Sequence, residues 1–84
     1  MHLPPVRQLQ YLVALREELH FGKAAKSLNV TQSTLSSGIR ELEVSLGITL
    51  VERTNRSVSF TTAGEKITDR ARYVLMQVED LVTE

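Results

Sequence analysis

Apolar residues recur at steps of three and four in the first half of the chain, the spacing of one face of an α-helix. The first such stretch follows Pro5, which suits the first turn of a helix because its missing N–H would be unpaired there anyway. We therefore expect a helix over about 5–18. A second pattern predicts a shorter helix over about 22–28 whose inner face carries Ala24 and Ala25, and these small side chains allow another helix to approach closely.

A third helix is predicted over 32–46, because one apolar stripe advances by four, three and four residues: Leu35, Ile39, Leu42 and Leu46. Asn29 suits a left-handed corner before this helix, Thr31 is a good N-cap, and Gly47 suits its end. Gly38 lies inside the helix, where glycine costs about 1 kcal/mol relative to alanine. A glycine at this position despite the cost suggests that a phosphate backbone or another helix approaches closely there.

Beyond this helix the apolar period changes to alternation, which predicts a two-stranded ribbon over 51–60 with its turn at 54–57. The sequence Thr62-x-x-Glu65 then has the form of a capping box, and a long last helix is expected over 63–84. Its apolar stripe has heptad spacing at Ile67, Ala71, Val74, Val78 and Leu81, and Leu75 and Val82 widen it. A 20-residue helix extends about 30 Å, well past a three-helix core. We therefore expect the stripe to pair two copies of the chain, the alternative being that it folds back on the core.

The composition restricts the class of protein. Eighty-four residues allow one small domain, and the absence of cysteine excludes disulfides and thiolate metal sites. Ten basic side chains balance ten acidic ones, but no acidic residue lies between Glu18 and Glu41. No apolar run approaches the roughly 20 residues that span a bilayer, and the first residues lack the features of a signal peptide. We therefore expect a soluble protein that does not bind a membrane.

The sequence offers no constellation for catalysis. The two histidines, His2 and His20, have no carboxylate or second histidine at ligand or triad spacing. Glu41 and Glu43 are two positions apart on a helix and face different directions. We expect no enzyme activity, no metal and no cofactor, and we expect His20 simply to pack beside Phe21.

The second and third helices, joined by a tight corner, have the organisation in which the later helix can lie in the major groove of DNA. Five of its first six positions are polar: Gln32, Ser33, Thr34, Ser36 and Ser37. Such side chains can bond to base edges or phosphates, and Arg40 lies one turn further on. The ribbon carries Arg53 and Arg56, and arginine suits both a narrow minor groove and phosphates. The alternative is that these polar residues only solvate exposed surfaces.

At these residues the chain resembles the LysR-type transcriptional regulators. The resemblance covers nearly the whole chain and is carried by three motifs: Phe21-x-x-Ala24-Ala25-x-x-Leu28-x-Val30-Thr31-Gln32-Ser33-x-Leu35-Ser36-x-x-Ile39-Arg40-x-Leu42-Glu43, Leu46-Gly47-x-x-Leu50-x-x-Arg53 and Thr61-x-Ala63-Gly64. Further segments are most similar to the peroxide-responsive branch of the family: Leu9-x-Tyr11-Leu12-Val13-Ala14-Leu15, His20-Phe21 and Leu50-Val51-Glu52-Arg53-Thr54.

The resemblance implies a mainly α fold, with a winged helix-turn-helix over 1–62 and a dimerisation helix over 63–84. The implied DNA-binding residues divide by role: Thr31 at the start of the recognition helix, Gln32, Ser33, Thr34 and Ser37 toward base edges, Ser36, Arg40 and Arg53 toward phosphates, and Arg56 in the minor groove. The implied partners are double-stranded DNA with a partly palindromic operator, a second copy of the chain, and an effector bound by a C-terminal domain that this chain lacks. A tetramer of the full-length protein stays open, and the implied location is the bacterial cytoplasm, at the nucleoid.

Three positions depart from the pattern of the family. Ser33 stands where many members have proline, Gly38 where glutamine is frequent, and Gly22 where a serine or threonine cap is usual. The first two alter the surface that would read DNA, so the base preference of other members does not transfer. The competing function is a helical protein-interaction module that binds no DNA, which explains the heptads but gives the polar helix start and the ribbon no role.

Overall fold

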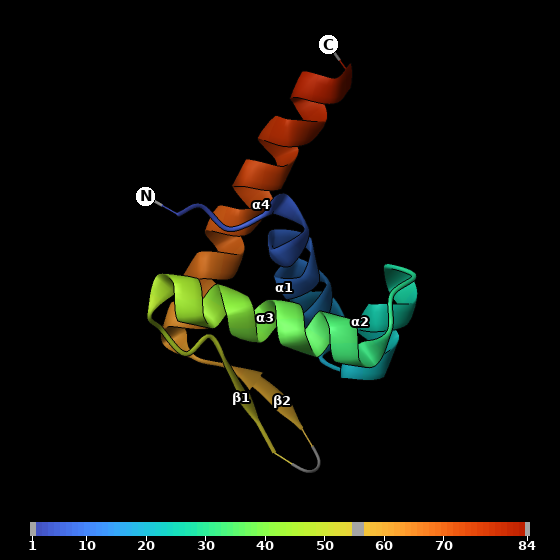
Figure 1. Cartoon of the computed structure of the whole chain (residues 1–84), viewed down its shortest axis with the longest axis vertical. Coiled ribbons are helices and arrows are strands. Elements are labelled where there is room, and N and C mark those ends of the chain that lie inside the picture. Colours follow the sequence, from blue (N-terminus) through green and yellow to red (C-terminus); the bar gives the residue numbers. More distant parts are fainter. Residues whose placement is uncertain (1, 55–56, 84) are drawn as a thin grey trace.

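The computed structural model describes residues 2–54 and 57–83. Its elements follow one another as α1 (Val6–Glu18), α2 (Phe21–Ser27), α3 (Gln32–Leu46), β1 (Val51–Arg53), β2 (Val58–Phe60) and α4 (Thr62–Thr83). The predicted elements are confirmed, with boundaries that differ by at most one residue. Helices α1, α2 and α3 form the body, the β1–β2 hairpin lies at one end of the molecule, and the C-terminal part of α4 projects from the other (Figure 1). No helix among the described residues is long and apolar enough to cross a membrane.

The core lies where α1, α2 and α3 meet. Its fully buried leucine and isoleucine side chains are Leu12, Leu15, Leu35, Ile39, Leu42 and Leu50. Ala24 and Ala25 are also buried, so the small inner face of α2 brings this helix close to its neighbours, as expected. Leu35, Ile39 and Leu42 of the predicted α3 stripe therefore face inward and fix which side of the helix is left outside, whereas Leu46, its fourth member, is exposed.

The corners around α2 depend on backbone conformation and capping. Asn29 adopts the expected left-handed conformation, with φ of 59°. The Nδ1 atom of His20 accepts a hydrogen bond from the backbone N–H of Lys23 at 3.0 Å, so His20 is the N-cap of α2. The expectation that His20 only packs beside Phe21 was wrong, because its exposed ring satisfies a backbone donor at the helix start. Gly22 consequently lies inside the helix and not at its cap.

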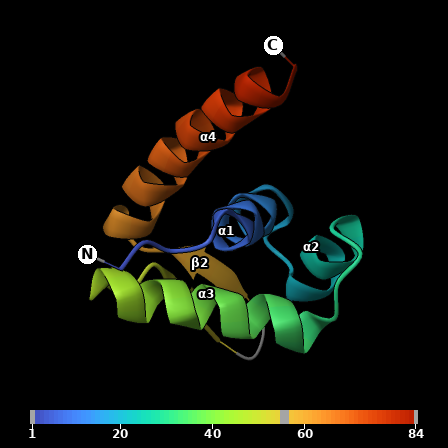
Figure 2. The same ribbon diagram turned by 45° about the horizontal axis from the view of Figure 1, so that its top comes forward.

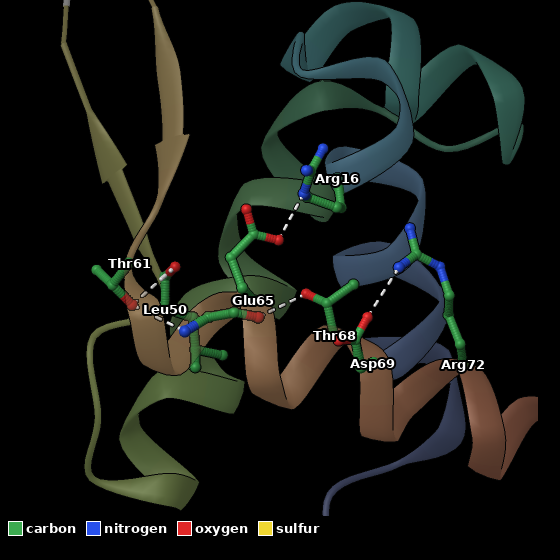
Figure 3. A network of polar contacts seen from close by, with 8 residues as sticks. Arg16, Leu50, Thr61, Glu65, Thr68, Asp69 and Arg72 are labelled. Carbon is green, nitrogen blue, oxygen red and sulfur yellow. Dashed lines mark hydrogen bonds and ion pairs between the residues drawn. The ribbon is translucent and has the colours of Figure 1, made fainter.

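The first turn of α4 is fixed by Thr61. Its Oγ1 accepts a hydrogen bond from the backbone N–H of Gly64 at 2.8 Å (Figure 3). It donates one to the carbonyl of Thr49, also at 2.8 Å. The predicted capping box of Thr62 and Glu65 was wrong: Thr61 occupies the capping position, and Glu65 bonds to Arg16 in α1. The antiparallel hairpin pairs Val51 with Phe60 and Arg53 with Val58, which brings Thr61 back beside Leu50.

Gly38 allows close contact between α1 and α3. A Cβ atom at this position would lie 2.4 Å from Cδ2 of Tyr11, whose ring is buried. Of the two reasons anticipated for a glycine here, the approach of another helix is the one that the structure supports.

The apolar stripe of α4 divides between two environments. Ile67 is partly buried and Ala71 is buried against the domain's own core, so for these two residues the fold-back alternative holds. Val74 and Leu81 are 40% and 76% exposed. Leu75 and Val78 are half-buried beside a groove to which α1 contributes Val6 and Val13. The C-terminal part of α4 projects beyond the other helices (Figure 2). The C-terminal half of the stripe therefore remains exposed or half-buried in the single chain.

Candidate nucleic-acid interface

The start of α3 presents a polar surface on a rigid apolar support. Leu35, Ile39 and Leu42 are fully buried, whereas the side chains on the opposite side are exposed: Thr31, Gln32, Ser33, Thr34, Ser37 and Arg40. Ser36 is half-buried at the edge of this surface. Because the buried stripe holds the helix from behind, the predicted outward orientation of the polar face is confirmed.

Hydrogen bonds hold the first turn of this surface in place. The Oγ1 of Thr31 accepts a bond from the backbone N–H of Thr34 at 3.1 Å and donates one to the Thr34 hydroxyl at 2.8 Å. Thr31 thus acts as the predicted N-cap, and its hydroxyl is already engaged. Gln32 and Ser37 have no hydrogen bond within the described part of the chain, so their polar groups are available to a ligand.

Arg53 is the last residue of β1, next to the turn of the hairpin, and is held against α2. Its guanidinium carbon is 5.2 Å from the centre of the Phe21 ring, within the range of a cation–π contact. Its Nε and Nη2 atoms are buried and bond to no other residue that the structure describes. Burial lowers the pKa of Arg53, the nearby charge of Arg40 lowers it further, and Glu43 opposes both effects. An anion could reach these two N–H groups only if the guanidinium turned out of its buried position.

Glu43 sets the position of the hairpin relative to α3, a role that the sequence did not reveal. Its Oε2 accepts hydrogen bonds from the backbone N–H groups of Leu50 and Val51 at 2.8 and 3.1 Å. A carboxylate in the last turns of a helix, followed by a short loop into a strand, is the signal that could have indicated this bond. The interaction fixes where the hairpin leaves the body.

The structure places the remaining predicted residues as follows. Arg40 is exposed on α3, one to two turns beyond the polar start. Arg56, predicted at the tip of the hairpin, lies outside the described residues. Among the described residues, no group of three histidine, aspartate or glutamate side chains could hold a metal ion. The exposed start of α3 and the hairpin that follows it therefore form the candidate interface.

A second feature that the sequence did not indicate is a polar hollow between α1 and α3. Its lining comes from both helices: Arg7, Tyr11, Ser33, Thr34, Ser37, Gly38 and Glu41. Contact between α1 and α3 depends on the tertiary fold, so no local pattern could have pointed to Arg7. The hollow continues the polar surface of α3 toward the N-terminal end of α1.

A helix-turn-helix followed by a two-stranded hairpin defines the winged helix-turn-helix class. Residues 6–65 match the model of the bacterial regulatory helix-turn-helix proteins of the lysR family, and the chain belongs to this family. The predicted fold class and family are thereby confirmed. The family is one of transcription regulators, so the chain is a regulatory domain and not an enzyme.

Individual relatives agree with this assignment. The hydrogen peroxide-inducible genes activator of Haemophilus influenzae is 55% identical over 74 residues, which are 88% of this chain and 25% of the relative. The regulator EstR of Acinetobacter baylyi is 54% identical over 80 residues, 95% of this chain and 27% of the relative. The predicted likeness to the peroxide-responsive branch is confirmed by the first of these. The chain spans about a quarter of the length of these curated relatives.

A solved structure provides a comparison over almost the full length of both chains. The protein chain in the BenM_DBD/benA site 1 DNA complex is 40% identical in sequence to this chain, and the two structures match with a TM-score of 0.88. The match covers 94% of this chain and 89% of that chain. The fold of this chain is therefore that of a domain solved together with DNA.

Proposed function

We propose that this chain binds double-stranded DNA sequence-specifically as the DNA-binding part of a LysR-type transcription regulator. In this proposal α3 lies in the major groove and the β1–β2 hairpin reaches the minor groove. The observation that carries the proposal is the contrast between the exposed polar start of α3 and the fully buried Leu35 and Ile39 behind it. The likeness to a domain solved with benA site 1 DNA supports the same function.

Each polar residue of the interface takes a role that fits its surroundings. The residues assigned to base edges are Gln32, Ser33, Thr34 and Ser37, and those assigned to phosphates are Ser36, Arg40 and Arg53. Thr31 holds the start of α3 through its cap, and Arg56 is assigned to the minor groove. For Arg53, the assignment to a phosphate rests on the positive charge of its guanidinium, whose buried N–H groups without a described partner would have to turn outward to bond that phosphate.

The functional unit in this proposal is a homodimer formed through α4. The exposed Val74 and Leu81, with the half-buried Leu75 and Val78, supply the apolar surface, and Ile67 and Ala71 support it from the core side. A two-fold dimer would place two recognition helices on a partly palindromic site. Residues 1–62 then act as the reading domain and 63–84 as the dimerisation helix. An effector would act through a further domain, because the matched relatives are about four times longer, and the protein would work at the nucleoid in the bacterial cytoplasm.

Salt dependence of DNA binding tests this proposal against the interaction-module alternative. We expect the chain to bind a mixed-sequence duplex with an affinity that falls steeply between about 50 and 200 mM salt, because each neutralised phosphate releases counterions. Selection of bound sites from random DNA should then recover two related half-sites. A chain that forms dimers but binds no duplex at any of these salt concentrations would contradict the proposal and favour the interaction module.

A further inference from the structure

The hollow between α1 and α3 lies beside the side chains that we assign to DNA contact. On α3 it is bordered by Ser33 and Ser37, one turn apart, and by Glu41 one turn further on. A side chain larger than glycine at position 38 would enter the space of the Tyr11 ring, since even a Cβ atom would lie 2.4 Å from it. Position 38 therefore cannot carry a side chain that would fill the hollow.

Arg7 borders the hollow from the side of α1. It lies one turn before Tyr11, so the two side chains share a helix face. Arg7 is exposed and has no hydrogen bond or ion pair with any residue that the structure describes. Two of the other arginines are engaged: Arg16 bonds to Glu65 and Arg72 to Asp69. Arg7 is thus a long, unpaired cation beside the short hydroxyl side chains at the start of α3.

Glu41 is the acidic side chain of the hollow, and it is already held by another residue. Its Oε1 accepts a hydrogen bond from Nε2 of the buried Gln8 at 3.2 Å. The carboxylate lies on the α3 wall and would repel an anion placed deep in the hollow. An anionic ligand is therefore favoured at the outer rim, where the guanidinium of Arg7 can extend toward it.

We propose that Arg7 binds a backbone phosphate of DNA, so that α1 is a third part of the interface beside α3 and the hairpin. This inference rests on the proposed function. A duplex that touches Ser33 and Ser37 must pass the rim of the hollow, because these residues form its wall. The planar guanidinium offers two parallel N–H donors that match a phosphate, and its side chain is long enough to span a gap that the serines leave.

The test compares Arg7→Ala with the unchanged chain on a mixed-sequence duplex and on a site selected from random DNA. We expect Arg7→Ala to weaken binding to both duplexes roughly tenfold, the typical effect of losing one charge-assisted hydrogen bond. The slope of log affinity against log salt should fall by about 0.9 for each chain bound. Arg7→Lys should keep the slope, because lysine still neutralises a phosphate.

Two controls separate phosphate binding from other roles. Arg72→Ala removes one positive charge from α4 and should leave the affinity within about twofold. The loss caused by Arg7→Ala should persist in a Glu41→Gln background, because a direct phosphate contact does not depend on that carboxylate. If the loss disappears there, Arg7 only neutralises Glu41 and the inference is wrong.

The other possible outcomes of these titrations distinguish failure of the Arg7 inference from failure of the proposed function. An Arg7→Ala variant with the affinity and salt slope of the unchanged chain would overturn the inference while leaving the proposed function intact. A loss confined to the selected site, with an unchanged slope, would also overturn it. If the unchanged chain itself shows no salt-dependent binding, the proposed function fails first. Circular dichroism of Arg7→Ala should match that of the unchanged chain, since Arg7 has no described partner to lose.

Discussion

The Nε atom of Arg16 in α1 donates a hydrogen bond to Oε1 of Glu65 in the first turn of α4, across 2.7 Å (Figure 3). The guanidinium carbon of Arg16 also lies 5.8 Å from the centre of the Phe60 ring in β2. This hydrogen bond and the carboxylate charge raise the pKa of Arg16. One arginine thus links α1, the hairpin and the start of α4.

Removing the charge of Glu65 should loosen this link. We expect Glu65→Gln to lower the midpoint of urea unfolding slightly, because both side chains are partly exposed and water screens the pair. Glu79→Gln, a matched change in the exposed C-terminal half of α4, should leave the midpoint unchanged. Equal midpoints for the two variants would contradict a structural role for the Arg16–Glu65 pair.

Substitution of Gly38 should destabilise the fold although it improves helix propensity. In Gly38→Ala the new Cβ would press on the Tyr11 ring, and overpacking of this kind costs about 1 to 3 kcal/mol. The free energy of unfolding from urea titration measures the effect, and the additional change Tyr11→Leu should recover part of it. A gain of about 1 kcal/mol, as helix propensity alone would give, would show that α1 and α3 are not in close contact here.

The exposed half of the stripe on α4 should hold two copies together. Val74→Asp would place an unpaired charge in the proposed dimer interface, and we expect sedimentation equilibrium to find mainly single chains. Met76→Asp, on the opposite face of the same helix, is the control and should remain dimeric. A Val74→Asp variant that still sediments as a dimer would exclude this surface as the interface.

Much of the fold followed from local signals in the sequence. The cap at Thr31, the stripe from Leu35 and the left-handed stop at Gly47 act within a few residues, so the bounds of α3 could be predicted. Both Thr61 and Thr62 could cap α4, and the choice depends on carbonyls of the preceding strand region that lie 11 and 12 residues away in sequence. No local pattern contains that contact.

In the candidate site, too, the features set by local helix geometry could be predicted, and those set by tertiary contacts could not. Exposure of Gln32 and Ser37 followed from the buried stripe on the opposite face, because helix geometry ties the two together. The packing of Ala71 on the core did not follow from the heptads, since spacing shows that a stripe exists but not what covers it. The roles of Glu43 and Arg7 also depend on neighbours brought close only by the tertiary fold.

The most direct test of the central claim is the effect of Gln32→Ala on discrimination between a selected site and random DNA. The claim is that the outward face of α3 reads base edges, and a well-placed base contact contributes about 1 to 3 kcal/mol of discrimination. Binding titrations at one fixed salt concentration should show a much larger loss on the selected site than on the random duplex. An equal loss of affinity on both duplexes would contradict the claim.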